Sequence, residues 1–80
     1  MTGQLKDQLG NVLKELRKDR GLTLRELGKE AGVSATLISD IENGRYYPSL
    51  KTLSKLSNAL EVKISQIFFA AESGKCVNKE

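Results

Sequence analysis

The chain has 80 residues, enough for one domain with a core of modest size. Thirteen Lys and Arg against ten Asp and Glu leave a net charge of +3, which permits a polyanionic partner without requiring one. The sequence shows no long apolar run and no signal peptide, and its single Cys76 excludes an internal disulfide, so we expect a protein of the reducing cytoplasm.

Apolar residues recur at helical spacing in five blocks, which predicts an all-α fold. The first block covers residues 5–16, and Gly21 ends it. The second begins at Thr23, which forms a T-x-x-E capping box with Glu26, and it ends at Gly32.

Serines predict the start of the next two helices. Ser34 opens a third helix that ends at Gly44. Ser49 opens a fourth, in which we expect an inward stripe formed by Leu50, Leu53, Leu56, Ala59 and Leu60. A short fifth helix follows, marked by Val62, Ile64, Ile67 and Phe68. Because the chain is polar from about Ala71, we predict a domain over residues 1–70 and a flexible tail over 71–80.

Residues 23–43 have the form of a helix, a tight turn and a second helix. Gly28 lets the two helices approach closely, and Gly32 can adopt a left-handed turn conformation. The outward side of the third helix carries short or polar residues, and such a helix can enter the major groove of B-DNA, which is about 12 Å wide.

Residues 13–68 resemble the phage-repressor and Cro class of helix-turn-helix domains, the Xre family. The resemblance lies in the segments LKELRKDRGLT, ELGKEAGVSATLISDIENGR, PSLKTLSKLSNALEV and ISQIFF. It implies a compact five-helix, lambda-repressor-like fold with its helix-turn-helix at helices 2 and 3. It also implies a transcriptional regulator, encoded by a bacterium or phage and associated with the nucleoid, that binds a palindromic double-stranded DNA operator as a homodimer.

The resemblance assigns roles to individual residues. Base-reading positions are Ala35, Thr36, Ser39 and Asp40. Asp40 could instead point to solvent, because a carboxylate repels phosphates. The expected phosphate-binding residues are Thr23, Arg25, Asn43, Gly44, Arg45, Tyr46 and Lys51. Arg17 and Glu42 match a pair that joins the first helix to the end of the third; the alternative is a plain surface ion pair.

The sequence departs from the family pattern at two places. Leu24 replaces the Gln that usually follows the Thr cap, so Arg25 either supplies the lost phosphate contact or the anchor is weaker. Glu61 and Lys63 replace the usual Gly and capping Ser before the fifth helix, which predicts a less stable junction.

Two further expectations concern partners. Ile64, Ile67 and Phe69 form an expected dimer contact on the last helix. A competing function is a protein-interaction module that binds a toxin or antirepressor, because residues 34–43 lack Lys and Arg and carry two acids, Asp40 and Glu42. The absence of His and of phosphate-cradling or metal-binding motifs argues against an enzyme, a metal site or a cofactor.

Overall fold

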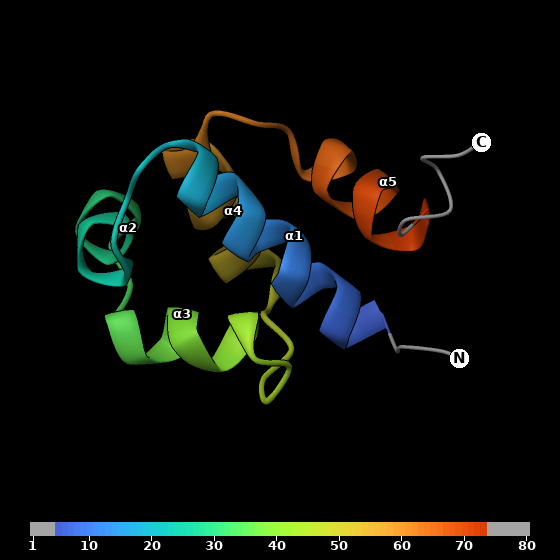
Figure 1. Ribbon diagram of the computed structural model, residues 1–80, viewed down its shortest axis with the longest axis horizontal. Coiled ribbons are helices and arrows are strands. Elements are labelled where there is room, and N and C mark those ends of the chain that lie inside the picture. Colours follow the sequence, from blue (N-terminus) through green and yellow to red (C-terminus); the bar gives the residue numbers. More distant parts are fainter. Residues whose placement is uncertain (1–4, 74–80) are drawn as a thin grey trace.

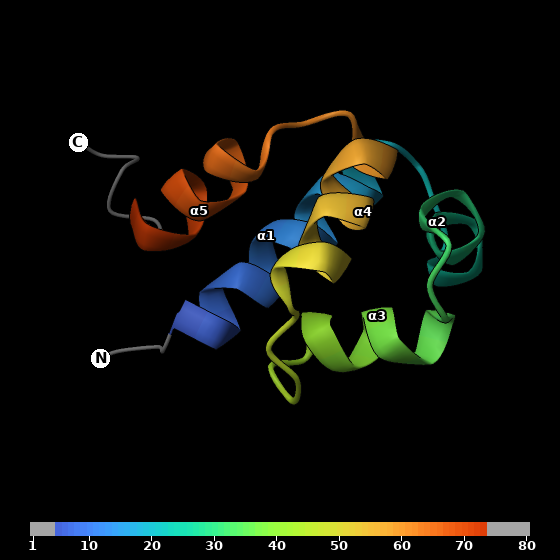
Figure 2. The same ribbon diagram turned by 180° about the vertical axis from the view of Figure 1, so that it is seen from behind.

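The computed structural model describes residues 5–73, which contain five helices and no strand. These are α1 (Leu5–Asp19), α2 (Leu24–Ala31), α3 (Ala35–Glu42), α4 (Leu50–Leu60) and α5 (Ile64–Ser73). In Figure 1, α1 crosses the middle of the molecule in front of α4, with α2 and α3 at one end and α5 at the other. The view from behind in Figure 2 brings α4 to the front and leaves α3 along the lower edge. The all-α prediction is confirmed.

The predicted helix starts are confirmed by hydrogen bonds over three residues. The Thr23 hydroxyl oxygen accepts from the Glu26 amide at 3.0 Å, and the Thr23 amide donates to the Glu26 carboxylate at 2.9 Å, which completes the capping box. The Ser34 hydroxyl accepts from the Leu37 amide at 3.0 Å, and Ser49 caps α4 in the same way. Gly32 ends α2 with φ +77°, a left-handed conformation that favours glycine.

One core fills the space between the helices. Its fully or nearly fully buried side chains are Leu9, Leu13, Leu27, Ala31, Ile38, Ile41, Leu53, Leu56, Leu60, Ile67 and Ala71. Leu50 was expected on the inner side of α4, but it is 68% exposed because it occupies the first turn, where α4 has not yet reached the core.

The predicted domain end at residue 70 is too early. α5 continues to Ser73, and Ala71 is 0% exposed, so its methyl group belongs to the core. The residues after Ala71 are polar, which favours a tail in the sequence. The last turn of α5 nevertheless includes these positions, and it holds Ala71 in the core. The predicted flexible tail otherwise falls on residues 74–80, outside the described range.

The junction between α4 and α5 carries the expected structural cost. Glu61 ends α4 with φ +61°, a left-handed conformation that costs a non-glycine residue about 1 kcal/mol. At the start of α5, the Gln66 side-chain oxygen accepts from the Lys63 amide at 2.8 Å, which is one half of a capping box. The Arg20 guanidinium supports the junction by donating to the Ala59 carbonyl at 2.8 Å.

No helix within residues 5–73 is long and apolar enough to cross a membrane. The same residues hold no group of three or more Cys, Asp or Glu placed to bind a metal ion.

Candidate nucleic-acid interface

Two glycines set the position of α3. A Cβ on Gly28 would lie 2.6 Å from the Val33 carbonyl oxygen, so only glycine lets α2 lie so close to the turn before α3. A Cβ on Gly10 would overlap the Ile41 carbonyl oxygen and lie 2.8 Å from that of Glu42. The role of Gly28 was predicted. That of Gly10 was missed, although an isolated glycine inside a helical pattern is a signal of close packing.

An ion pair joins the end of α3 to α1. Arg17 Nε and Nη2 donate to the two Glu42 carboxylate oxygens at 2.7 and 3.0 Å, and the two side chains are only 11% and 5% exposed. Arg17 Nη1 also donates to the Leu22 carbonyl at 2.8 Å. The predicted contact is therefore a part-buried bridge and not a surface ion pair.

The expected base-reading residues lie on the outward side of α3. Ile38 and Ile41 are buried on the inward side. Thr36 is exposed, and Ala35, Ser39 and Asp40 are partly exposed. α3 lies along an outer edge of the molecule, and no other helix covers that edge in either view (Figures 1 and 2).

The carboxyl end of α3 is held by its own side chains and a left-handed glycine. The Asn43 side-chain amide donates to the Ser39 carbonyl at 2.9 Å and to the Ser39 hydroxyl at 3.3 Å. Gly44 has φ +76°, and a Cβ there would overlap the Asp7 carboxylate from α1. An acidic side chain therefore lies beside a position expected to meet phosphate, which sequence reasoning did not indicate.

Arg45 and Asp40 form a second ion pair. Arg45 Nη1 lies 3.3 Å from Asp40 Oδ1, and the side chains are 67% and 38% exposed. The family resemblance assigns Arg45 to phosphate and Asp40 to a base, without linking them. The fold brings them together.

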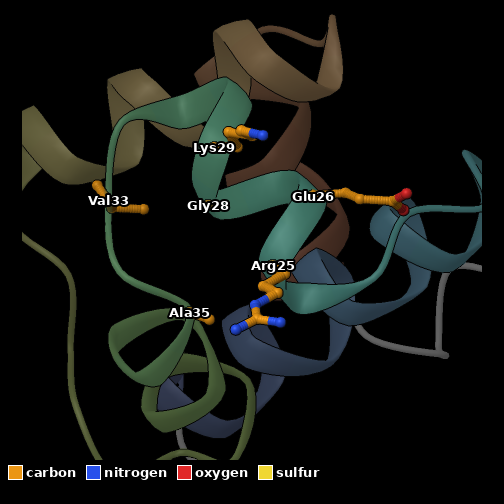
Figure 3. Close-up of a pocket in the computed structure, with 6 residues that line it drawn as sticks. All are labelled: Arg25, Glu26, Gly28, Lys29, Val33 and Ala35. Atoms are coloured by element: carbon orange, nitrogen blue, oxygen red, sulfur yellow. The ribbon is translucent and has the colours of Figure 1, made fainter.

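Of the other expected phosphate-binding residues, Arg25 lies beside the start of α3 and the rest are exposed. Arg25 and Lys29 lie at an open depression of about 400 Å³ between α2 and the start of α3, lined also by Glu26, Gly28, Val33 and Ala35. In Figure 3 the Arg25 guanidinium extends toward Ala35, the first residue of α3. Thr23, Tyr46 and Lys51 are exposed.

The expected dimer contact divides between surface and core. Phe69 is 67% exposed and lines a shallow depression with Ser65 and Gln66. Ile64 is half-buried. Ile67 is 0% exposed within the protomer, so its inclusion in a dimer contact is wrong; helical spacing points it at the core while Phe69, two residues on, points away.

Comparison with known sequences gives one family. The helix-turn-helix model HTH_3 matches residues 13–74. The ImmF control region 10 kDa protein of Bacillus phage phi105 is 40% identical over 72 residues, which cover 84% of this chain and 80% of that protein. The immunity repressor protein of the same phage is 41% identical over 59 residues, 74% of this chain but only 41% of that protein.

Solved structures agree with this result. The clp gene regulator ClgR from C. glutamicum superposes with a TM-score of 0.83 at 32% identity, covering 90% of this chain and 94% of that one. The restriction-modification controller protein C.AhdI from Aeromonas hydrophila gives 0.75 at 28% identity, covering 76% and 92%. The chain therefore belongs to the HTH_3 helix-turn-helix family and to its phage-repressor, Xre-type class.

Proposed function

We propose that this protein is a sequence-specific DNA-binding transcriptional regulator that inserts α3 into the major groove of a palindromic operator as a homodimer. One observation carries the proposal: the outward side of α3 is open and bears short side chains, while its inward side is fixed in the core by Ile38 and Ile41. Short side chains let the helix backbone come close to the base edges.

The chemistry of that side suits base reading. The Thr36 hydroxyl can donate or accept a hydrogen bond, and its methyl group, like that of Ala35, can contact the methyl of thymine. Arg25 beside the start of α3 and Arg45 just after its end are exposed, as is Lys51 in the first turn of α4, and such cations can bind the phosphates that flank the groove.

The names of the relatives support a regulator and not an enzyme, since they describe an immunity repressor, a clp gene regulator and a restriction-modification controller. The acidic character of residues 34–43 had favoured a protein-interaction module instead. Both acids are paired with arginines, Glu42 with Arg17 and Asp40 with Arg45, so this segment presents little net negative charge. This pairing offsets the charge that favours the alternative.

Selection from a pool of random duplexes, followed by gel shift on the enriched operator, tests the proposal. Thr36→Arg places a long side chain on the reading face and should abolish the selected preference. Asn58→Arg adds the same charge on an exposed position of α4, away from α3 and from the expected dimer contact, and serves as the matched control. Because phosphate contacts release counterions, affinity should fall by about a thousandfold or more between about 50 and 200 mM salt.

The proposal fails if no duplex is enriched, or if Thr36→Arg and Asn58→Arg leave the same operator preference. If a monomer binds an operator that has a single half-site, the palindromic operator and the homodimer are wrong, but the proposed DNA binding stands.

A further inference from the structure

The turn after α3 folds Arg45 back over Asp40. The Gly44 amide donates to the Ile41 carbonyl at 3.1 Å, and the Arg45 amide donates to the Asp40 carbonyl at 2.8 Å. These two bonds and the left-handed Gly44 form a Schellman motif, in which the second residue past the helix end lies beside the third residue from that end. The Arg45 side chain then reaches Asp40 Oδ1 at 3.3 Å. The backbone conformation of the turn therefore places the Arg45 side chain beside Asp40.

The pair changes what the outward side of α3 presents to DNA. Of the two acids in α3, Glu42 is buried against Arg17, so Asp40 is the one carboxylate that faces outward. Alone, it would oppose entry into a groove between two rows of phosphates. Arg45 cancels that charge. Because both side chains are substantially exposed, the ion pair adds little to folding and can be altered without loss of the domain.

We propose that Asp40 is a specificity-determining residue that selects a base with an amino group in the major groove, and that Arg45 is the positioning residue that makes its approach possible. Arg45 binds Oδ1, and among the described side chains, residues 7–72, none donates to Oδ2. An ionised carboxylate only accepts hydrogen bonds. In the major groove only cytosine N4 and adenine N6 are donors, whereas guanine and thymine present acceptors that Asp40 would repel. This inference rests on the proposed function.

A double-mutant cycle tests the link between the two residues. Operator selection and affinity measurements use the wild type, Asp40→Asn, Arg45→Gln and the double variant, with Glu72→Gln on α5 as a control that removes one exposed acid elsewhere. Asn can donate as well as accept a hydrogen bond. At one position of each half-site, Asp40→Asn should therefore lower the preference for cytosine or adenine over guanine and thymine on the contacted strand by about tenfold. Thermal melting confirms that each variant is folded.

Arg45→Gln should weaken operator binding about tenfold more in the wild-type background than in the Asp40→Asn background, because only the former leaves an unpaired carboxylate against DNA. This inference is overturned if Arg45→Gln lowers operator affinity equally in both backgrounds. It is also overturned if Asp40→Asn selects the same bases as the wild type at every position. In either case the proposed function as a DNA-binding regulator stands. If the wild type enriches no duplex, the proposed function fails first and the inference falls with it.

Discussion

Arg17 on α1 and Glu42 at the end of α3 are joined by two parallel hydrogen bonds, across 25 residues of sequence. The hydrogen bonds to Glu42 raise the pKa of Arg17 above its ordinary value, against the opposing effect of burial. Because this pKa is raised, the contribution of the pair to stability is fully present below the ordinary pKa of arginine and is lost only as pH rises through the raised pKa, in the strongly alkaline range. Arg17 therefore stays charged, and keeps its ion pair with Glu42, at neutral and mildly alkaline pH.

Replacing Glu42 with Gln should lower the free energy of unfolding by about 3 kcal/mol, because the nearly buried Arg17 loses its counter-charge. Denaturant titration measures the change. Glu15→Gln removes an exposed acid from α1 and should alter stability by less than about 0.5 kcal/mol. Similar effects of the two substitutions would show that the bridge contributes no more than a surface ion pair.

Gly10→Ala should destabilise the fold by about 2 kcal/mol or more, since the new methyl group overlaps the carbonyl oxygens at the end of α3. Gly21→Ala provides the comparison: its φ of +70° costs about 1 kcal/mol, but a Cβ there meets nothing within 4 Å. Unfolding curves should rank Gly10→Ala as the worse of the two. The reverse order would contradict the close approach of α1 to α3.

Lys63→Ser should stabilise the protein by about 1 kcal/mol, because a serine hydroxyl can accept from the Gln66 amide and complete the capping box. For a domain of this size, that gain corresponds to a rise in Tm of about 4–8 °C. Lys63→Ala removes the same side chain without adding an acceptor. If it raises Tm as much as serine does, removal of lysine and not capping is the cause.

Phe69→Ser should weaken the proposed homodimer while leaving the protomer folded, since the ring is mostly exposed. Sedimentation velocity reports the association and circular dichroism the helix content. Ile67→Ser should instead cost about 3 kcal/mol or more by leaving a cavity and a polar group in the core. A Phe69→Ser variant with unchanged association would place the dimer contact on another surface.

The helices and their caps follow from interactions between residues close together in the chain. Thr23, Ser34 and Ser49 each bond to an amide three residues ahead, and Gly32 needs only its own backbone conformation. Such interactions are local, so the order of residues is sufficient to predict them. The spacing of apolar residues within each helix likewise predicted most of the core.

Which helix surfaces meet depends on the packing of the helices against one another. The apolar residues of the last helix predict one dimer contact that includes Ile67 and Phe69, yet the packing of α5 on α1 buries Ile67 and leaves Phe69 exposed. The need for glycine at position 10 arises where α1 meets the end of α3, 31 residues further along the chain at Ile41. Such burial and close approach arise from contacts between helices, so the pattern of residues along one helix does not predict them.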